Sequence, residues 1–176
     1  MNRATHAAAA VITAALLAGC STATSTTPKA APSNQAGQPA PAPGKAVTDA
    51  TSAFTTVSAA VPSAKLGTTV TAESDPNHML GRPNGYTSKI TFTDARIPAE
   101  QTEGRGPDDL ELGGSIEVFP TAAGAKARAD YIQAATKDMP ALSEYDYVHG
   151  TTLIRVSRLL TPAQAADYKT AAGKLL

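Results

Sequence analysis

Ile116-Glu117-Val118 and Ile154-Arg155-Val156 are two short runs in which a charged residue stands between two branched apolar ones. This alternation predicts two β-strands, each with one buried face. Each run is followed by a threonine that can cap a helix, Thr121 or Thr161, and then by an alanine-rich segment that carries one tyrosine. The repeated pattern of strand and helix indicates either a divergent duplication or two instances of one packing arrangement.

The helix after the second run has the clearest start in the chain. Thr161-Pro162-Ala163-Gln164 has the form of a capping box with proline at the first helical position. The buried stripe predicted for this helix comprises Ala165, Tyr168, Ala172 and Leu175. The stripe predicted for the helix after Thr121, which we expect to end at Pro140, comprises Ala125, Ala129, Ile132 and Met139.

Further helix and strand patterns flank these two units. A first helix, ended by Pro62, is predicted from apolar residues at intervals of three and four: Val47, Ala50, Phe54, Val57 and Val61. Strands are predicted at 66–72, 86–93, 145–148 and 151–157, and the last two flank a hairpin turn at His149-Gly150. The order α-β-β-β-α-β-β-α predicts the α+β class, with a single small antiparallel sheet and helices packed on one face.

If the helices cover the face formed by isoleucine and valine, the other face of the sheet is open to solvent. Lys89, Glu117 and Arg155 lie on this second face, among threonines. Opposite charges on neighbouring strands contribute roughly 0.2 to 1 kcal/mol per pair, so a cross-strand ladder accounts for the three residues. A ligand-binding face is the alternative.

The composition bounds what the chain can be. Lys and Arg together number 15, as do Asp and Glu, so the formal net charge is zero and we expect no nucleic-acid partner. With no Trp, 3 Phe and 5 Tyr, the core must consist largely of Val, Ile, Leu and Ala. These apolar residues are enough for the core of one modest domain, which we place at residues 46–176.

The first 19 residues have the three parts of an export signal peptide. Met1-Asn2-Arg3 is a short positive region, and Ala7 to Leu17 is an uncharged run too short to be a lasting transmembrane helix. The run ends in Leu17-Ala18-Gly19-Cys20, which resembles the lipobox of bacterial lipoproteins. The resemblance implies cleavage before Cys20 and a diacylglycerol thioether on its sulfur, which anchors the mature protein at the outer, extracytoplasmic face of the cell membrane. The alternative is an ordinary secretory peptide with a chance cysteine.

Residues 20–45 join the lipidated cysteine to the domain. From Ser21 onward this segment consists of Ser, Thr, Ala, Pro, Gln and Gly with almost no large apolar side chain, so it cannot bury enough surface to offset the entropy of ordering. We expect a disordered tether. A flexible coil of about 25 residues has a root-mean-square reach of roughly 25 to 30 Å, so the domain would lie clear of the lipid headgroups.

The densest group of functional side chains lies on two adjoining turns between the first and second predicted strands. The candidate ligand-binding residues there are Asp75, Asn77, His78, Arg82 and Tyr86. Arg82 together with His78 could hold an anion. The same residue types also build turns, because Asp and Asn bond to the local backbone while Pro and Gly set the bend. Both interpretations stay open.

Patterns for catalysis and metal binding are absent from the sequence. The chain has no Gly-x-Ser-x-Gly or Ser-x-x-Lys motif and, with Cys20 lipidated, no free thiol. His78 and His149 are too few for a zinc site, and Asp108, Asp109 and Glu111 lack the ligand spacing of a calcium loop. We therefore expect no metal, no cofactor and no catalytic residue, and the protein is not expected to be an enzyme.

Taken whole, the chain resembles uncharacterised small lipoproteins of high-GC Gram-positive bacteria and of their phages. The resemblance rests on the lipobox, the low-complexity tether and the segment from Asp75 to Lys89. The leading hypothesis is a non-catalytic binding or accessory module that holds an unidentified component of the cell envelope. One alternative is a phage or prophage surface protein that acts in superinfection exclusion. The other is a hydrolase whose site is assembled from distant residues.

Overall fold

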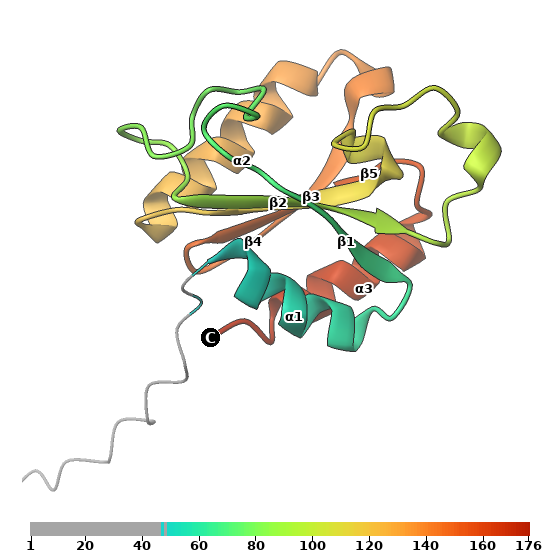
Figure 1. Ribbon diagram of the computed structural model, residues 1–176, viewed down its shortest axis with the longest axis horizontal. Helices are drawn as coiled ribbons and strands as arrows, with labels where there is room; N and C mark the ends of the chain where they lie inside the picture. The colour runs from blue at the N-terminus through green and yellow to red at the C-terminus, as the bar shows by residue number, and fades with distance from the viewer. Residues whose placement is uncertain (1–46, 48) are drawn as a thin grey trace, which may run out of the picture. The chain divides into compact units, whose positions relative to one another are not determined.

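The computed structural model describes residue 47 and residues 49–176, coloured in Figure 1. The predictions for the signal peptide, for Cys20 and for the tether up to residue 45 lie outside the described residues. In the part of the chain that is described, no helix is both long enough and apolar enough to cross a membrane.

Within residues 49–176 the chain forms three α-helices, five β-strands and three short 3-10 helices. In chain order they are α1 (Ala50–Ala60), β1 (Ala64–Thr69), β2 (Ser88–Asp94), η1 (Ala99–Gln101), η2 (Leu110–Leu112), β3 (Gly113–Val118), α2 (Ala122–Thr136), η3 (Pro140–Leu142), β4 (Glu144–His149), β5 (Thr152–Ser157) and α3 (Pro162–Ala172). This is the predicted order of helices and strands, so the α+β class is confirmed.

Each α-helix begins at a side chain that bonds to the free backbone N–H groups of the first turn. Thr161 and Gln164 form the predicted capping box of α3, and Thr121 accepts the N–H of Gly124 at the start of α2. Helix α2 ends at Thr136, before Met139, whose side chain is 45% exposed. The prediction that Met139 belongs to the buried stripe is therefore wrong, because the helix stops one turn too early to carry it.

The five strands form one antiparallel sheet in the order β1-β2-β3-β5-β4. The predicted hairpin joins β4 to β5, and Gly150 adopts the positive φ of 54° that its turn requires. In the register of the central strands, Lys89 lies directly opposite Glu117, and Ser115 lies opposite Arg155. The sheet therefore places the three charged residues of the predicted ladder on adjacent strands.

The two faces of the sheet are covered by different helices. Helices α1 and α3 pack on one face, where the principal core contains Phe54, Ile90, Phe92 and Ile154. Helix α2 packs on the opposite face, where Ala125, Ala129 and Ile132 meet Leu153. Figure 1 shows α2 on one side of the sheet and α1 with α3 on the other.

The expectation that all helices pack on one face is therefore wrong, and so is the expectation of an open second face. Glu117, Lys89 and Arg155 lie under α2 and the neighbouring loops, and the side chain of Glu117 is fully buried. Alternation along a strand shows which residues share a face, but it does not show which helix covers that face. The second face is a buried polar layer.

Candidate functional site

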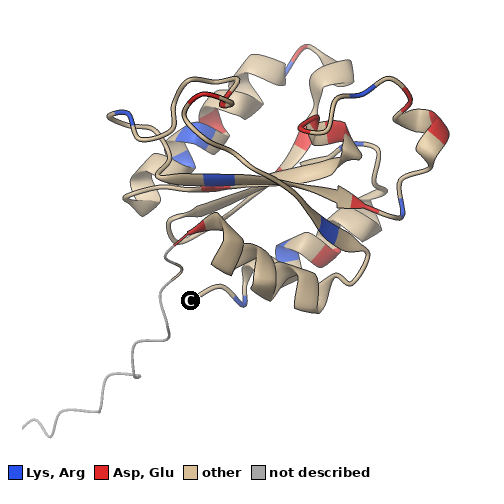
Figure 2. Cartoon of the chain, viewed as in Figure 1, with Lys and Arg blue, Asp and Glu red and all other residues tan. Residues whose placement is uncertain are grey.

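A group of charged side chains, which we call the charged floor, lies on the α2 side of the sheet. Its members are Lys89 of β2, Glu117 of β3, Arg128 of α2, Glu144 of β4 and Arg155 of β5. Figure 2 shows both basic and acidic positions on the sheet and on α2. The predicted ladder is thus present, extended by Arg128 and Glu144.

Glu117 is the centre of the charged floor. Its carboxylate contacts Lys89 at 3.5 Å, Arg128 at 3.3 Å and Arg155 at 3.3 Å. A buried carboxylate without such partners would cost several kcal/mol, so the three cations make its burial possible. Burial lowers the pKa of Lys89, and the charge of Glu117 partly offsets this effect.

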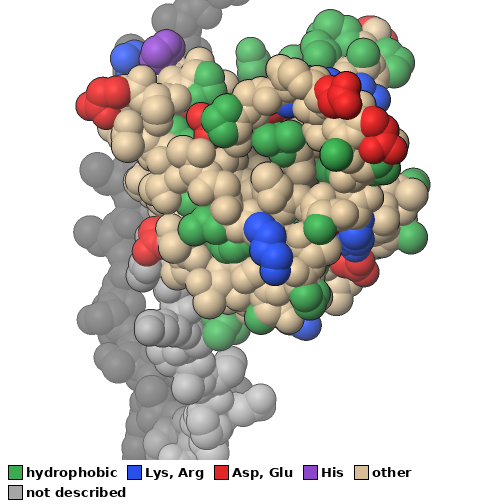
Figure 3. Space-filling view, turned by 45° about the vertical axis from the view of Figure 1, so that its right-hand side comes forward, with side chains coloured by type: hydrophobic (Ala, Val, Ile, Leu, Met, Phe, Trp, Pro, Cys, Tyr) green, Lys and Arg blue, Asp and Glu red, His purple; other side chains and the backbone are tan. Residues whose placement is uncertain are grey.

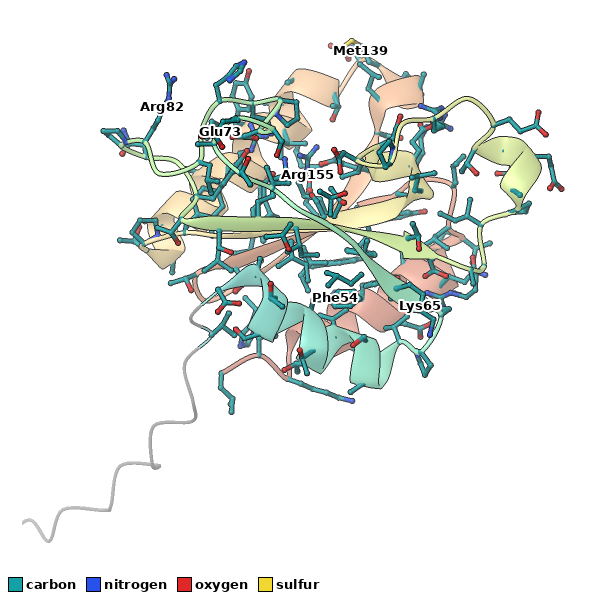
Figure 4. All side chains as sticks on the ribbon, viewed as in Figure 1. Phe54, Lys65, Glu73, Arg82, Met139 and Arg155 are labelled. Carbon is teal, nitrogen blue, oxygen red and sulfur yellow. The ribbon has the colours of Figure 1, made fainter. Side chains whose placement is uncertain are left out.

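Arg155 ties the centre of the sheet to the edge strand β4. Its Nε and Nη2 donate to the two oxygens of Glu144 at 2.7 and 2.8 Å, a bidentate arrangement. Burial alone would lower the pKa of Arg155, but the hydrogen bonds that it donates to Glu144 and the charge of Glu117 raise it above its ordinary value. Figure 4 shows Arg155 above the sheet, on the side opposite Phe54.

The predicted site between Asp75 and Tyr86 divides into an inner and an outer part. Asp75 is buried, and its carboxylate accepts a hydrogen bond from the Tyr86 hydroxyl and two from the backbone N–H groups of Met79 and Leu80, at 2.7 and 2.9 Å. Burial alone would raise the pKa of Asp75, but these donors lower it below its ordinary value. Asn77 joins the group through its amide, which donates to the Tyr86 hydroxyl at 3.3 Å.

The outer part contains the other two predicted residues. His78 and Arg82 are exposed, and Figure 4 shows Arg82 pointing away from the domain. His78 adopts a positive φ of 51°, as residues in tight turns do. The structure thus brings Asp75, Asn77 and Tyr86 together as the support of two turns and leaves His78 and Arg82 outside. A ligand-binding role for the five residues stays a prediction.

A groove with a volume of about 1130 Å³ lies above the charged floor. Helix α2 forms one wall through small side chains such as Ala127 and Ala135, together with Tyr131. The turns that contain Asn77 and Asn84, and the loop from Arg105 to Glu111, form the opposite wall. Phe119, Glu144 and Arg155 form its base, and Leu142 lies at one end.

The charged side chains that line the groove are all paired. Arg128 and Arg155 contact Glu117, and Arg155 also holds Glu144. At the rim, Arg105 contacts both Asp109 and Glu111. On the surface that Figure 3 shows, acidic and basic side chains occur singly and in small groups among uncharged atoms. The groove therefore offers hydrogen-bonding groups and apolar surface, but no unpaired charge in its lining.

Residues 49–176 contain no cluster of side chains suited to bind a metal ion. No three His, Cys, Asp or Glu side chains in this range come close enough together to hold an ion.

Three parts of the site were missed from the sequence, namely Arg128, the role of Glu144 in the charged floor, and the groove itself. A signal for Arg128 exists, since it falls on the same helical stripe as Ala125 and Ile132 and is the one charged residue within that stripe. A charge on the inner face of a helix requires an opposite charge beneath it, and Glu117 is that charge. The loop from Arg105 to Glu111 carries no comparable signal, because its position depends on the packing of the whole domain.

Comparison with protein-family models, with curated proteins and with solved structures finds no match to this chain.

Proposed function

We propose that this chain is an extracytoplasmic lipoprotein, held by lipid on Cys20, whose domain is a non-catalytic module that binds an extended peptide segment in the groove. The lipobox and the tether support the anchoring. The observation that carries the binding proposal is the groove beside α2, with its apolar wall and its fully paired charges.

The dimensions of the groove suit an extended chain. Helix α2 contributes lining residues from Ala123 to Thr136, so the groove follows all but the first of its 15 residues, or about 21 Å at ~1.5 Å per residue. A peptide in extended conformation covers this length with about six or seven residues at ~3.3 Å each. Ligand sites in proteins commonly combine apolar walls with a few placed polar groups, as this groove does.

The charges favour a ligand without net charge. An anionic ligand would compete with Glu144 for Arg155, or with Asp109 and Glu111 for Arg105. Such competition would leave a displaced carboxylate without its partner, which costs free energy where the carboxylate is buried. A neutral peptide can instead place apolar side chains against α2 and donate or accept at Asn77 and Asn84 on the other wall.

Thermal unfolding of the domain tests the binding proposal. The panel would contain neutral, acidic and basic heptapeptides, envelope glycan fragments and fatty acids. A ligand at one hundred times its dissociation constant stabilises by about 2.7 kcal/mol, which raises the melting temperature by several degrees. We expect neutral apolar peptides to raise it, and a shift produced only by glycans or fatty acids would contradict the peptide assignment.

A matched pair of variants ties the shift to the groove. Ala127 and Ala134 are both exposed residues of α2, and of these two only Ala127 lines the groove. Ala127→Trp should abolish the ligand-induced shift, whereas Ala134→Trp should keep it. A shift that survives in Ala127→Trp would place the ligand elsewhere.

Metabolic labelling tests the anchor separately. Cells that express the full chain and receive an alkyne analogue of palmitate should yield a labelled, membrane-associated protein. Cys20→Ala should lose the label and the membrane association together. Retention of the label in Cys20→Ala would contradict lipidation at this residue.

A further inference from the structure

Helix α2 contacts the edge strand β4 through the side chain of Gln133, which bonds to one carboxylate and one backbone oxygen of that strand. The side-chain amide of Gln133 donates to Asp146 and, at 3.5 Å, to the backbone oxygen of Glu144. Glu144 and Asp146 are two residues apart on β4, so their side chains point to the same face of the sheet. We call this group the carboxyl clasp; it comprises Gln133, Glu144 and Asp146.

The second oxygen of Asp146 is buried and accepts no hydrogen bond. An ionised carboxylate in that position would lack a donor for one oxygen and would lie beside the negative charge of Glu144. A proton on Asp146 removes the repulsion and supplies a donor, because the protonated group can donate a hydrogen bond to a neighbouring carboxylate. The unsatisfied oxygen of Asp146 therefore favours the protonated form of this group.

The charges around Asp146 do not supply a full counterion. Glu144 uses the guanidinium of Arg155 bidentately, and that guanidinium also contacts Glu117. The other charged or titratable groups that line hollows together with Asp146 are Lys126 and Asp130 of α2, Tyr147 and His149 of β4, and Lys169 of α3. Lys126 is already paired with Asp130 at 2.7 Å.

We propose that the carboxyl clasp is a pH-sensitive contact between α2 and β4. It holds α2 against β4 while Asp146 carries a proton, and it loosens when the proton is lost. Because α2 is one wall of the groove, its loosening changes the width of the groove. The control of peptide binding rests on the proposed function, but the fastening of α2 does not.

The direction of the pH effect on the carboxyl clasp, and the pH range in which it occurs, follow from the raised pKa of Asp146. Burial, and then the charge of Glu144, raise the pKa of Asp146 to about 7 in the folded protein. A carboxyl group with a raised pKa stabilises the folded state fully below its unfolded pKa of about 3.9, and this contribution is lost as the pH rises through the folded value. The clasp is thus closed in mildly acidic solution and weakened above neutral pH.

Hydrogen exchange of the full-length chain, without ligand, tests the clasp. Between pH 5 and pH 8, after correction for the intrinsic pH dependence of exchange, the opening of residues 122–136 should increase at least tenfold. The amides of α3 (Pro162–Ala172) serve as an internal control and should change much less. An equal change in both helices, or no change in α2, would overturn the proposal.

Two substitutions separate Asp146 from all other titrating groups. Asp146→Asn keeps an acceptor for Gln133 and supplies a permanent donor toward Glu144, so the protection of α2 should become independent of pH at the level seen in acid. Asp130→Asn removes a neighbouring exposed carboxylate of α2 and should leave the pH dependence as in the wild type. Wild-type pH dependence in Asp146→Asn would overturn the proposal. Because no ligand is present, the result does not depend on whether the groove binds peptides.

Discussion

The two faces of the sheet are built from alternate residues of the same strands, yet they are covered in opposite ways. Under α1 and α3, Ile90, Phe92 and Ile154 form a closed apolar core. Under α2, their chain neighbours Lys89 and Arg155 form part of a paired charged layer with a groove above it. The apolar face carries most of the hydrophobic stabilisation, whereas the charged face leaves room for a ligand.

The difference also shows why burial alone does not identify a core. The side chain of Glu117 is as inaccessible as that of Ile116 beside it. Ile116 stabilises the fold through the area it removes from water, roughly 25 cal/mol per Å². Glu117 is tolerated only because three cations surround it, and a buried ion pair of this kind often contributes little net stability. A buried charge retained in this way indicates organisation of a site more than stability.

The largest effect is expected from a cavity on the apolar face. The ring of Phe92 lies 5.2 Å from that of Tyr168 and 6.0 Å from that of Phe54, measured between centroids. Phe92→Ala should lower the free energy of unfolding by about 4 kcal/mol, measured by urea denaturation. Leu66→Ala, opposite Phe92 on β1 but 47% exposed, is the control and should cost less than about 1 kcal/mol. A loss below about 1 kcal/mol for Phe92→Ala would contradict the assignment of the principal core.

A smaller but still large effect is expected on the charged face. Glu117→Gln leaves Lys89, Arg128 and Arg155 without their shared anion and should cost about 3 kcal/mol in the same measurement. The exposed pair of Lys126 and Asp130 provides the comparison, since Asp130→Asn should change stability by less than about 0.5 kcal/mol. If Glu117→Gln had no effect, the charged floor would be hydrated and not buried.

An intermediate effect is expected in the turns beside the groove. Tyr86→Phe removes the hydroxyl that donates to Asp75 and should cost about 1 to 2 kcal/mol. Arg82→Ala should change stability by less than about 0.5 kcal/mol, because Arg82 is exposed. Measuring both the free energy of unfolding and peptide binding in these two variants distinguishes a binding site at residues 75–86 from turns that serve only the fold. Lost binding in Arg82→Ala would favour a site that extends to the outer turn, and stability lost in Tyr86→Phe alone would favour turns.

The smallest effect is expected from titrating one carboxyl group on each face. Burial alone would raise the pKa of Asp94, but hydrogen bonds from Arg96 and Tyr168 lower it, as the donors around Asp75 lower the pKa of that group. A lowered pKa contributes stability above the unfolded value of about 3.9, and this stability is lost as the pH falls below it. The melting temperature should therefore fall between pH 5 and pH 2.5, and less steeply in Asp94→Asn. An unchanged slope in Asp94→Asn would show that the Asp94 carboxyl does not contribute.

Local signals predicted much of this fold from the sequence. The capping box at Thr161, the cap at Thr121 and the hairpin at Gly150 depend on residues close together in the chain, and all three are present. The distribution of helices between the two faces was predicted wrongly, because it depends on the path of the connections before and after α2. The groove escaped prediction for the same reason, since its walls come together only when the turns around Asn77 and the loop at Arg105 fold over the sheet.

The most direct test of the difference between the two faces is to map amide chemical shifts of the domain by NMR while a peptide is added. The peptide is a neutral one that raises the melting temperature of the domain. The perturbed amides should lie in residues 121–136, 77–85 and 105–111, which surround the groove. Those of α1 (Ala50–Ala60) and α3 (Pro162–Ala172) should stay unchanged. Perturbations centred on α1 and α3, with the amides of α2 unmoved, would contradict the account.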